Sequence, residues 1–414
     1  MILKNKKVQQ YGLLTVANFG TMFFAFITNI LMTSLLTEND YGTYRYIINT
    51  IIMIVSFSNL GIYYSTARLL TNANKERERD LYGATIAMMF FISVFVAVVI
   101  FVVYKIITCF FHNIDPTFLY ALPLIYTVMI QRTFIYMLKG SNKIFDVSLQ
   151  TILPQILMLT IYSFVFIINF KHMNFLTSLC IYACVFIITD FITIARLRIR
   201  FLTGIKKETK NIYSEQKRNG FEIYKGSLLA VFSADALNVI IGSITMKAHY
   251  AVYTLALSFS SPILQIPAIM GVIQFKKYAN TNKLDKKEIG ITVIIGLLAY
   301  LGLNIIMLMF FPIVYKDRYL GTPSFVLALS LGYLFHGFGD YFNNFLNAHG
   351  EGSSIKKGAY FSGITQIVLA ALLVPYLELW GLAISRITAS FVYFIIMLQR
   401  YHRVSRKTSK VGED

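Results

Sequence analysis

The most regular feature of the sequence is a series of long apolar stretches separated by short polar segments. Each stretch approaches the roughly 20 apolar residues that an α-helix needs to cross the hydrocarbon core of a bilayer. Their apolar residues are continuous, whereas the strands of a membrane β-barrel alternate apolar and polar positions. The pattern predicts an all-α membrane protein with twelve transmembrane helices, over residues 11–36, 44–70, 81–108, 117–138, 147–169, 175–195, 223–246, 249–274, 289–314, 322–347, 357–376 and 379–400.

The composition agrees with a chain that has the bilayer as its solvent. Hydrophobic residues make up 56% of the 414 residues and charged residues 14%, whereas soluble domains carry about 25% charged residues. The net charge of +18 would indicate nucleic-acid binding in a soluble protein. Here the basic residues lie in short loops between apolar stretches, so membrane topology explains them and no nucleic-acid partner is expected.

The basic residues also predict the orientation, because cytoplasmic loops are enriched in Lys and Arg. With a cytoplasmic N-terminus, the cytoplasmic segments hold 28 of the 38 Lys and Arg residues. The outer loops hold only Lys171, Lys247, Lys316 and Arg318. The sequence therefore predicts that both termini are cytoplasmic and that each half has an even number of spans.

Two weak internal matches predict a repeat. Residues 40–44 (DYGTY) resemble residues 249–253 (HYAVY), and residues 138–140 (LKG) resemble residues 346–348 (LNA) at nearly the same offset. Two lobes of six helices around a central cavity are a common transporter plan. The predicted organisation is a lobe over 1–200, a basic cytoplasmic linker over 201–222, a second lobe over 223–400 and a basic tail over 401–414.

Polar side chains inside the spans gather on helical faces. Polar groups in hydrocarbon are costly, so they usually face a water-filled cavity or a neighbouring helix. The candidates for substrate contacts in the cavity are Asn18, Arg45, Asn49, Asn59, Arg132, Asn238 and Arg386. The candidates for ion coupling are Asp235, midway through the seventh span, and His336 and Asp340, one turn apart in the tenth.

Each candidate also has a purely structural interpretation. Small polar residues often serve as contacts between helices. Arg132 could extend its side chain to the interface, and Arg45 and Arg386 could reach outer water. Asp235 could form an ion pair with an arginine, and His336 with Asp340 could be a structural pair.

Several chemistries have no motif in this sequence. There is no GxxxxGK[ST] phosphate loop, no HExxH zinc motif and no GxSxG nucleophile elbow. The cysteines Cys109, Cys180 and Cys184 fall inside apolar segments without metal-ligand spacing. We therefore expect a transporter, not an enzyme, with no cofactor and no metal site.

Two stretches resemble a known family. The first is Leu35-Leu36 with Glu38-Asn39-Asp40-Tyr41-Gly42, before an apolar helix that ends near Asn59-Leu60-Gly61-Ile62. The second is Leu373-Val374-Pro375 with Leu379-Trp380-Gly381-Leu382-Ala383-Ile384-Ser385-Arg386. Both resemble the bacterial oligosaccharide flippases, the Wzx or polysaccharide-transporter family, whose superfamily also holds drug/cation antiporters and the lipid II flippase.

The resemblance implies a function. Such a protein moves an undecaprenyl-pyrophosphate-linked oligosaccharide across the bacterial cytoplasmic membrane for a surface polysaccharide such as O-antigen or capsule. It implies alternating access coupled to an ion gradient, contact with membrane lipids, and action as a monomer beside a polymerase and a chain-length regulator. Arg45, Arg132 and Arg386 could bind the pyrophosphate, since guanidinium groups pair with phosphate oxygens bidentately.

Three other functions stay open at the level of sequence. A lipid II flippase usually has extra C-terminal spans and a more cationic early cavity, whereas twelve spans are predicted here. A multidrug/cation antiporter of the same fold would favour an acidic cavity, and the arginines on the polar faces argue against it. A membrane polymerase or ligase of glycan assembly usually needs a sizeable outer loop, and the predicted outer loops are short.

Overall fold

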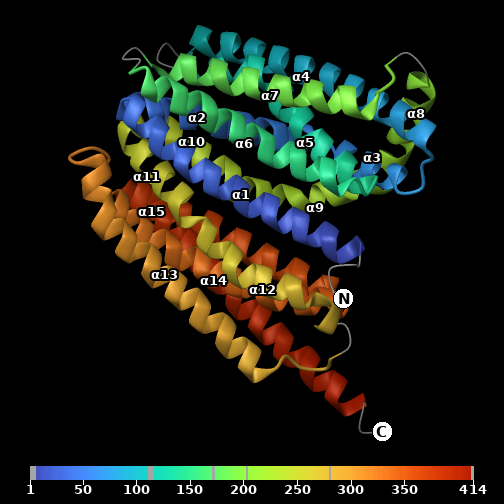
Figure 1. Ribbon diagram of the computed structural model, residues 1–414, viewed down its shortest axis with the longest axis vertical. Coiled ribbons are helices and arrows are strands. Elements are labelled where there is room, and N and C mark those ends of the chain that lie inside the picture. The colour runs from blue at the N-terminus through green and yellow to red at the C-terminus, as the bar shows by residue number, and fades with distance from the viewer. Residues whose placement is uncertain (1–5, 111–115, 170–172, 202–203, 279–280, 412–414) are drawn as a thin grey trace. The chain divides into compact units, whose positions relative to one another are not determined.

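A computed structural model describes residues 6–110, 116–169, 173–201, 204–278 and 281–411 (Figure 1). Secondary structure in these ranges is helical, without a strand. The α-helices are α1 (Lys6–Leu35), α2 (Glu38–Ser58), α3 (Ile62–Leu70), α4 (Lys75–Phe110), α5 (Ile125–Gly140), α6 (Ile144–Ile167), α7 (Phe175–Leu197), α8 (Ile205–Glu215), α9 (Phe221–Val231), α10 (Leu237–Ile244), α11 (Lys247–Ser260), α12 (Pro262–Tyr278), α13 (Lys286–Tyr315), α14 (Thr322–Ala348) and α15 (Gly352–Val411). A 3-10 segment, η2 (Pro116–Leu124), and two π-helical segments, η3 (Gln216–Gly220) and η4 (Phe232–Ala236), complete the set.

The helices account for all twelve predicted spans. Within the described residues, eight helices are long and apolar enough to cross a membrane, and the bent pair α2–α3 makes a ninth. Helix α15 contains two predicted spans, which meet at Glu378, where the backbone leaves the helical region (φ 46°, ψ −121°). Helix α14 and the run α9–η4–α10 cover the other two. The prediction of an all-α, twelve-helix membrane protein is therefore confirmed.

The second span differs from the prediction of one continuous helix over 44–70. It breaks between α2 and α3 and bends by 65°. Asn59 fills the break, because its Nδ2 donates to the Ser56 carbonyl (2.7 Å) and its Oδ1 accepts from the Gly61 amide (3.0 Å). Leu60 and Gly61 both have positive φ, at 50° and 82°. A positive φ favours glycine and is incompatible with the α-helix. The helix therefore ends here, although the apolar pattern of the sequence continues.

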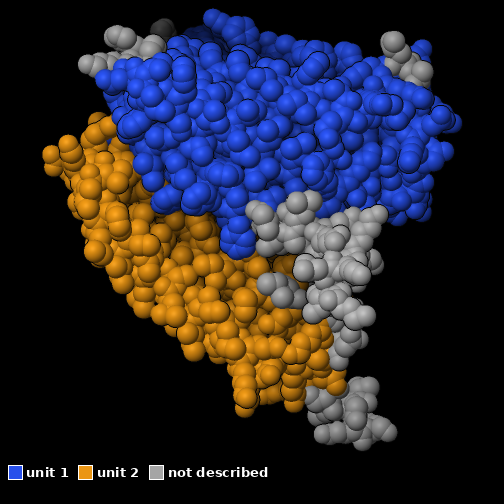
Figure 2. Space-filling model, in the orientation of Figure 1, with its two compact units in different colours: residues 1–231 blue, residues 232–414 orange. Residues whose placement is uncertain are grey.

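The chain forms two compact units, Met1–Val231 and Phe232–Asp414 (Figure 2). Helix α9 belongs to the first unit because it packs on α2, where the Tyr224 hydroxyl donates to the Phe57 carbonyl (2.6 Å). The division therefore lies inside the seventh predicted span, just before the π-helical segment η4. The described residues of the predicted basic linker pack on the first unit as α8 and η3.

Each unit has its own helix packing. In the first unit, α1 packs on α6, α5 packs on α3 and α4, and α6 packs on α7. In the second unit, α14 is central and contacts α11, α12, α13 and α15. Tyr341 and Phe345 of α14, Tyr278 of α12 and Met397 of α15 belong to one core cluster of this unit.

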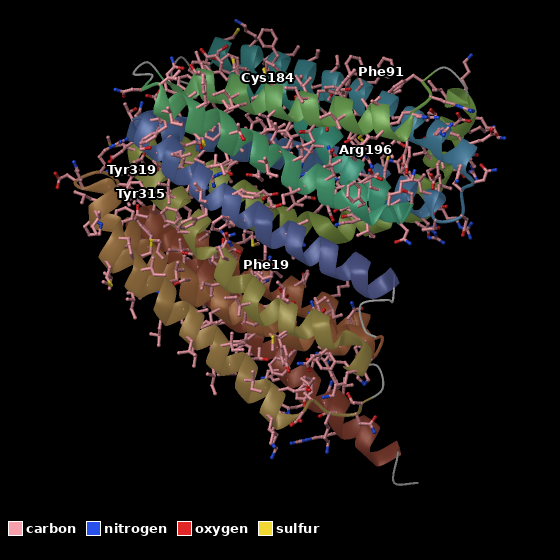
Figure 3. The ribbon with its side chains drawn as sticks, viewed as in Figure 1. Phe19, Phe91, Cys184, Arg196, Tyr315 and Tyr319 are labelled. Carbon is pink, nitrogen blue, oxygen red and sulfur yellow. The ribbon has the colours of Figure 1, made fainter. Side chains whose placement is uncertain are left out.

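The outer helices expose large apolar side chains. Phe91 on α4 is 70% exposed, and Leu298 on α13 is 63% exposed. Figure 3 shows Phe91 and Cys184 on α4 and α7 of the first unit. Water would penalise so much exposed apolar surface, whereas lipid chains accept it. These faces are those of a multi-pass membrane protein.

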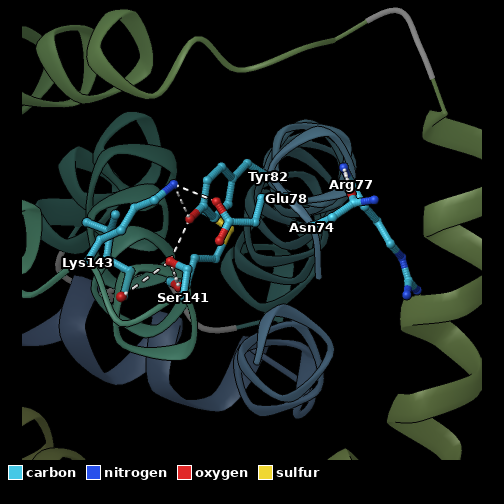
Figure 4. A network of polar contacts seen from close by, with 8 residues as sticks. Asn74, Arg77, Glu78, Tyr82, Ser141 and Lys143 are labelled. Atoms are coloured by element: carbon cyan, nitrogen blue, oxygen red, sulfur yellow. Dashed lines mark hydrogen bonds and ion pairs between the residues drawn. The ribbon is translucent and has the colours of Figure 1, made fainter. Parts of the chain in front are cut away.

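A polar network joins the ends of α4, α5 and α6 (Figure 4). Lys143 Nζ donates to Glu78 Oε2 (2.7 Å) and to the Tyr82 hydroxyl (3.2 Å), which donates to Ser141 Oγ (2.6 Å). Burial alone would lower the pKa of Lys143, but its hydrogen bonds to Glu78 and Tyr82 and the charge of Glu78 outweigh burial and raise it. The network joins three span ends on the face that the sequence predicts to be cytoplasmic.

Candidate functional site

Two of the predicted substrate-binding arginines lie near the same tyrosine in the first unit. Arg132 of α5 donates from Nη1 to Ser56 Oγ of α2 at 2.9 Å. Arg45 of α2 and Arg132 both lie within electrostatic range of the Tyr182 hydroxyl on α7. Helices α2, α5 and α7 pack on one another, so the two arginines belong to helices in mutual contact.

Tyrosines surround the Arg132 side of this cluster. Tyr63 of α3 stacks on Tyr136 of α5, with ring centroids 5.3 Å apart and planes inclined by 14°. Tyr64 meets Tyr136 edge to face at the same centroid distance. Arg132 is within electrostatic range of the hydroxyls of Tyr63 and Tyr136. The region therefore combines a cation with aromatic faces and hydroxyls, the groups that bind phosphates and sugars.

The predicted asparagines of the first unit lie in three different settings. Asn18 is exposed on α1, and Asn49 is half-buried on α2, one turn from Arg45. Asn59 is buried, and both ends of its amide are used within the α2–α3 break. The structure thus gives Asn59 a backbone-capping role, which its place on a polar helical face did not reveal.

A buried carboxyl in this unit was not among the predicted site residues. Asp190 of α7 is 7% exposed, and its Oδ1 accepts from Gln150 Nε2 of α6 at 2.7 Å. Thr193 donates to Gln150 Oε1 at 2.6 Å, which fixes the orientation of the amide. The sequence shows Asp190 as an acidic residue within the sixth predicted span. Nothing in the sequence indicates that its partner is Gln150 on another helix.

The second unit links His336 and Asp340 of α14 through a tyrosine. The Tyr393 hydroxyl of α15 donates to Asp340 Oδ1 (2.9 Å) and accepts from Asn343 Nδ2 (3.0 Å). The His336 ring stacks on Tyr393, with centroids 4.6 Å apart and planes inclined by 20°. At Gly339 a Cβ atom would lie 2.4 Å from the Tyr393 ring, so this glycine permits the close approach. Sequence reasoning missed Tyr393, which sits among apolar residues.

Arg386 of α15 completes the cluster in the second unit. Its guanidinium carbon lies 5.6 Å from the centroid of the Tyr333 ring, at cation–π distance. Arg386 is also within electrostatic range of Asp235, of His336 and of the Tyr253 hydroxyl. The structure thus brings together the four ionisable residues predicted in this half of the chain: Asp235, His336, Asp340 and Arg386.

Asp235 lies in the π-helical segment η4, and Asn238 is half-buried in the following helix, α10. A π-helical turn inside an α-helical span widens the backbone and is frequent at functional sites. Among the residues that the structure describes, no group of three or more His, Cys, Asp or Glu side chains could hold a metal ion.

Comparison with known proteins agrees with this architecture. Residues 8–274, more than half of the chain, match the family model described as "Polysaccharide biosynthesis protein". No curated protein matches the sequence significantly.

Solved structures of transporters match nearly the whole chain. An inward-facing multidrug-resistance MATE transporter of the MOP superfamily superposes with a TM-score of 0.66 at 15% identity, over 94% of this chain and 96% of that one. The lipid II flippase MurJ, in an inward closed conformation, superposes with a TM-score of 0.69 at 13% identity, over 94% and 87%. A MOP-superfamily transporter from Pyrococcus furiosus, described as having a binding pocket of reverse polarity, superposes with a TM-score of 0.53 at 14% identity, over 95% and 94%.

At these identities the superpositions establish the fold, and the family match establishes the kinship. The solved structures are of transporters and of a flippase, and the two comparisons together confirm the resemblance to the polysaccharide flippases. The chain belongs to the polysaccharide biosynthesis protein family and has the helical membrane fold of the MOP-superfamily transporters.

Proposed function

We propose that the protein flips an undecaprenyl-pyrophosphate-linked oligosaccharide from the inner to the outer leaflet of the bacterial cytoplasmic membrane. The proposal rests on the arginine–tyrosine cluster of the first unit, in a chain of the polysaccharide biosynthesis family. The cluster consists of Arg45, Arg132, Tyr63, Tyr136 and Tyr182. A pyrophosphate headgroup brings negative charge into a site of low dielectric, where a fixed guanidinium stabilises it far more than in water.

Arg132 suits this role because its hydrogen-bond partner, Ser56 Oγ, is neutral. An incoming phosphate oxygen can replace the hydroxyl without breaking an ion pair. Arg45 and Asn49, on the same helix as Ser56, would add donors to the headgroup. The stacked pair Tyr63 and Tyr136 offers aromatic surface for the sugars next to the phosphate.

The cluster of the second unit supports coupling to an ion gradient. Asp235 lies within electrostatic range of Arg386, so the charge on Asp235 offsets that of the guanidinium. Protonation of Asp235 removes this offset and leaves Arg386 available to an anion. His336 and Asp340, joined through Tyr393, provide further titratable groups in the same unit. Alternating access between two lobes converts such a change of charge into transport.

The remaining elements of the proposal follow from topology and family. The basic loops favour cytoplasmic N- and C-termini. The protein would act as a monomer, in contact with membrane lipids, and would supply its product to a polymerase and a chain-length regulator.

The test is a strain that lacks the gene, complemented with wild type, Arg132→Lys or Arg132→Ala. We expect Arg132→Ala to lower the flipping rate roughly 10- to 100-fold, because a hydrogen bond to a charged group contributes about 1.5–3 kcal/mol. Arg132→Lys keeps the charge and should retain more activity. The readout is the share of lipid-linked oligosaccharide that is accessible from outside, together with surface polymer.

Arg196→Ala is the matched control, because Arg196 forms an exposed salt bridge with Asp146 (3.0 Å) away from the cluster. Wild-type flipping by Arg132→Ala would remove this residue from the headgroup site. If loss of the gene leaves surface polymer intact and changes only drug or cation tolerance, the protein is an antiporter and the proposal is wrong.

A further inference from the structure

The segment formed by α8 and η3 sorts its charges in a way that membrane topology alone does not require. A cytoplasmic loop needs an excess of Lys and Arg, but it does not need its acidic residues on one side and its basic residues on the other. In the described part of this segment, Glu208 and Glu215 turn toward the first unit, whereas five cations face outward.

Ion pairs hold the acidic face in place. Glu208 is 3% exposed and accepts from Arg77 Nε of α4 (3.3 Å) and from Asn211 Nδ2 (3.0 Å). Glu215 pairs with Arg68 Nε of α3 at 3.3 Å. Both carboxylates are therefore used inside the unit and do not neutralise the outer face.

The break between α2 and α3 anchors the other end of the segment. Gln216 Nε2 donates to the Leu60 carbonyl at 2.9 Å. Gly220 packs so closely on Gly61 that a Cβ atom at Gly61 would lie 2.3 Å from the Gly220 carbonyl oxygen. The segment is thus attached at several points, and its outer face has one defined orientation.

The outer face carries cations and one aromatic ring. Four of its exposed members follow helical spacing of three and four residues: Lys206, Lys210, Tyr213 and Lys217. Lys207 and Arg218 lie beside them and are also exposed. Tyr213 is 52% exposed, and Lys217 Nζ lies 4.6 Å from the centroid of its ring. Like charges at this spacing repel each other, and an external anion that lies against them reduces the repulsion.

The position of the face indicates where that anion comes from. The segment begins shortly after α7, a membrane span that ends at Leu197. Phe201 before it and Phe221 after it are each 41% exposed. Aromatic rings beside cations at the end of a span are typical of the bilayer interface, where the cytoplasmic leaflet presents anionic headgroups.

We propose that the outer face of α8 and η3 binds the headgroups of anionic phospholipids in the cytoplasmic leaflet. The phosphates lie against the five cations, and the rings of Phe201, Tyr213 and Phe221 enter the interfacial region. This site is separate from the transport clusters and does not depend on the proposed substrate.

Lipid-selective fluorescence quenching tests the proposal on the full-length protein. The chain has one tryptophan, Trp380, so Trp380→Phe with Tyr213→Trp places a single reporter on the face. The protein is reconstituted into vesicles of brominated phosphatidylglycerol mixed with plain phosphatidylcholine, and into the reverse mixture. The two quenching curves give the relative affinity of the site for the two lipids.

We expect phosphatidylglycerol to bind at the reporter at least fivefold more strongly than phosphatidylcholine. In the variant with all five cations replaced by Gln, the ratio should fall to about one. The control replaces five exposed cations of the second unit by Gln (Lys283, Lys286, Lys287, Arg403 and Arg406) and should keep the preference. Two results would overturn the proposal: an affinity ratio near one in the single-reporter protein, or an unchanged ratio after the five cations are replaced. A ratio near one in the single-reporter protein would leave an acidic protein partner as the alternative.

Discussion

The hydroxyl of Tyr393 offers the sharpest test of the second-unit cluster, because this one oxygen joins the side chains of Asp340 and Asn343. It donates to Asp340 Oδ1 at 2.9 Å and accepts from Asn343 Nδ2 at 3.0 Å, while its ring stacks on His336. Tyr393→Phe removes the oxygen and keeps the ring. Asp340 then loses a donor and Asn343 an acceptor, in a region where Tyr393 itself is buried.

The expected cost follows from these two orphaned groups. A buried polar group without its partner costs about 1–3 kcal/mol, and more when it is charged. A cost of about 2 kcal/mol corresponds to a fall in melting temperature of roughly 4–8 °C for a domain of about 150–250 residues. Thermal unfolding of the purified protein in detergent measures this shift.

Tyr360→Phe is the control, since Tyr360 lies on the same helix, α15, and is 53% exposed. It should change the melting temperature very little. In an Asp340→Ala background, Tyr393→Phe should cost less, because the carboxylate that needs the hydroxyl is gone. Equal melting temperatures for Tyr393→Phe and Tyr360→Phe would refute the reasoning that the hydroxyl stabilises this cluster.

Two further predictions concern the first unit and glycine packing. Gly61→Ala should prevent stable folding, because the residue has φ 82° and its new Cβ would lie 2.3 Å from the Gly220 carbonyl oxygen. The control is Gly302→Ala, whose new Cβ would have no atom within 4 Å; its melting temperature should stay the same or rise slightly. Equal yields of the two folded variants would contradict this prediction. Lys143→Met should lower the melting temperature by leaving Glu78 without its cation. In wild type the pKa of Lys143 is raised, so the Lys143–Glu78 pair stabilises the fold fully below the ordinary lysine pKa of about 10.4. This stabilisation is lost as pH rises through the raised pKa, and its loss at a lower pH would contradict the prediction.

Span lengths could be read from the sequence, because the bilayer imposes them directly on the hydropathy pattern. The α2–α3 break could not, because the residues on both sides of Leu60 and Gly61 continue the helical pattern and the bend depends on positive φ at these two positions. Asn59 looked like a cavity residue for the same reason: its helical face was visible, but its use as a cap was not.

The candidate site shows the same limit. His336 and Asp340 are one turn apart, so their proximity follows from helix geometry alone. Their link through Tyr393 depends on how α14 packs against α15, and no local pattern encodes the contact between residues 340 and 393. Asp190 was visible as an acidic residue inside a span, but its pairing with Gln150 on α6 required the fold.

The partners of the buried charges suggest a division of labour between the two units. In the first unit, the described hydrogen bonds of Arg132 and Asp190 go to neutral groups, a hydroxyl and an amide, so an arriving anion meets a cation without an ion pair to break. In the second unit, Arg386 lies within electrostatic range of Asp235, so the carboxylate weakens the attraction between Arg386 and an arriving anion. If the proposed function holds, the first unit is the better place for the pyrophosphate, and the second is the better place for an ion whose binding changes the charge balance. Asp235→Asn should then reduce the dependence of flipping on the ion gradient while leaving headgroup binding intact, whereas Arg132→Ala should reduce headgroup binding at any gradient. If both variants lost headgroup binding equally and kept the same gradient dependence, the two roles could not be assigned to separate units.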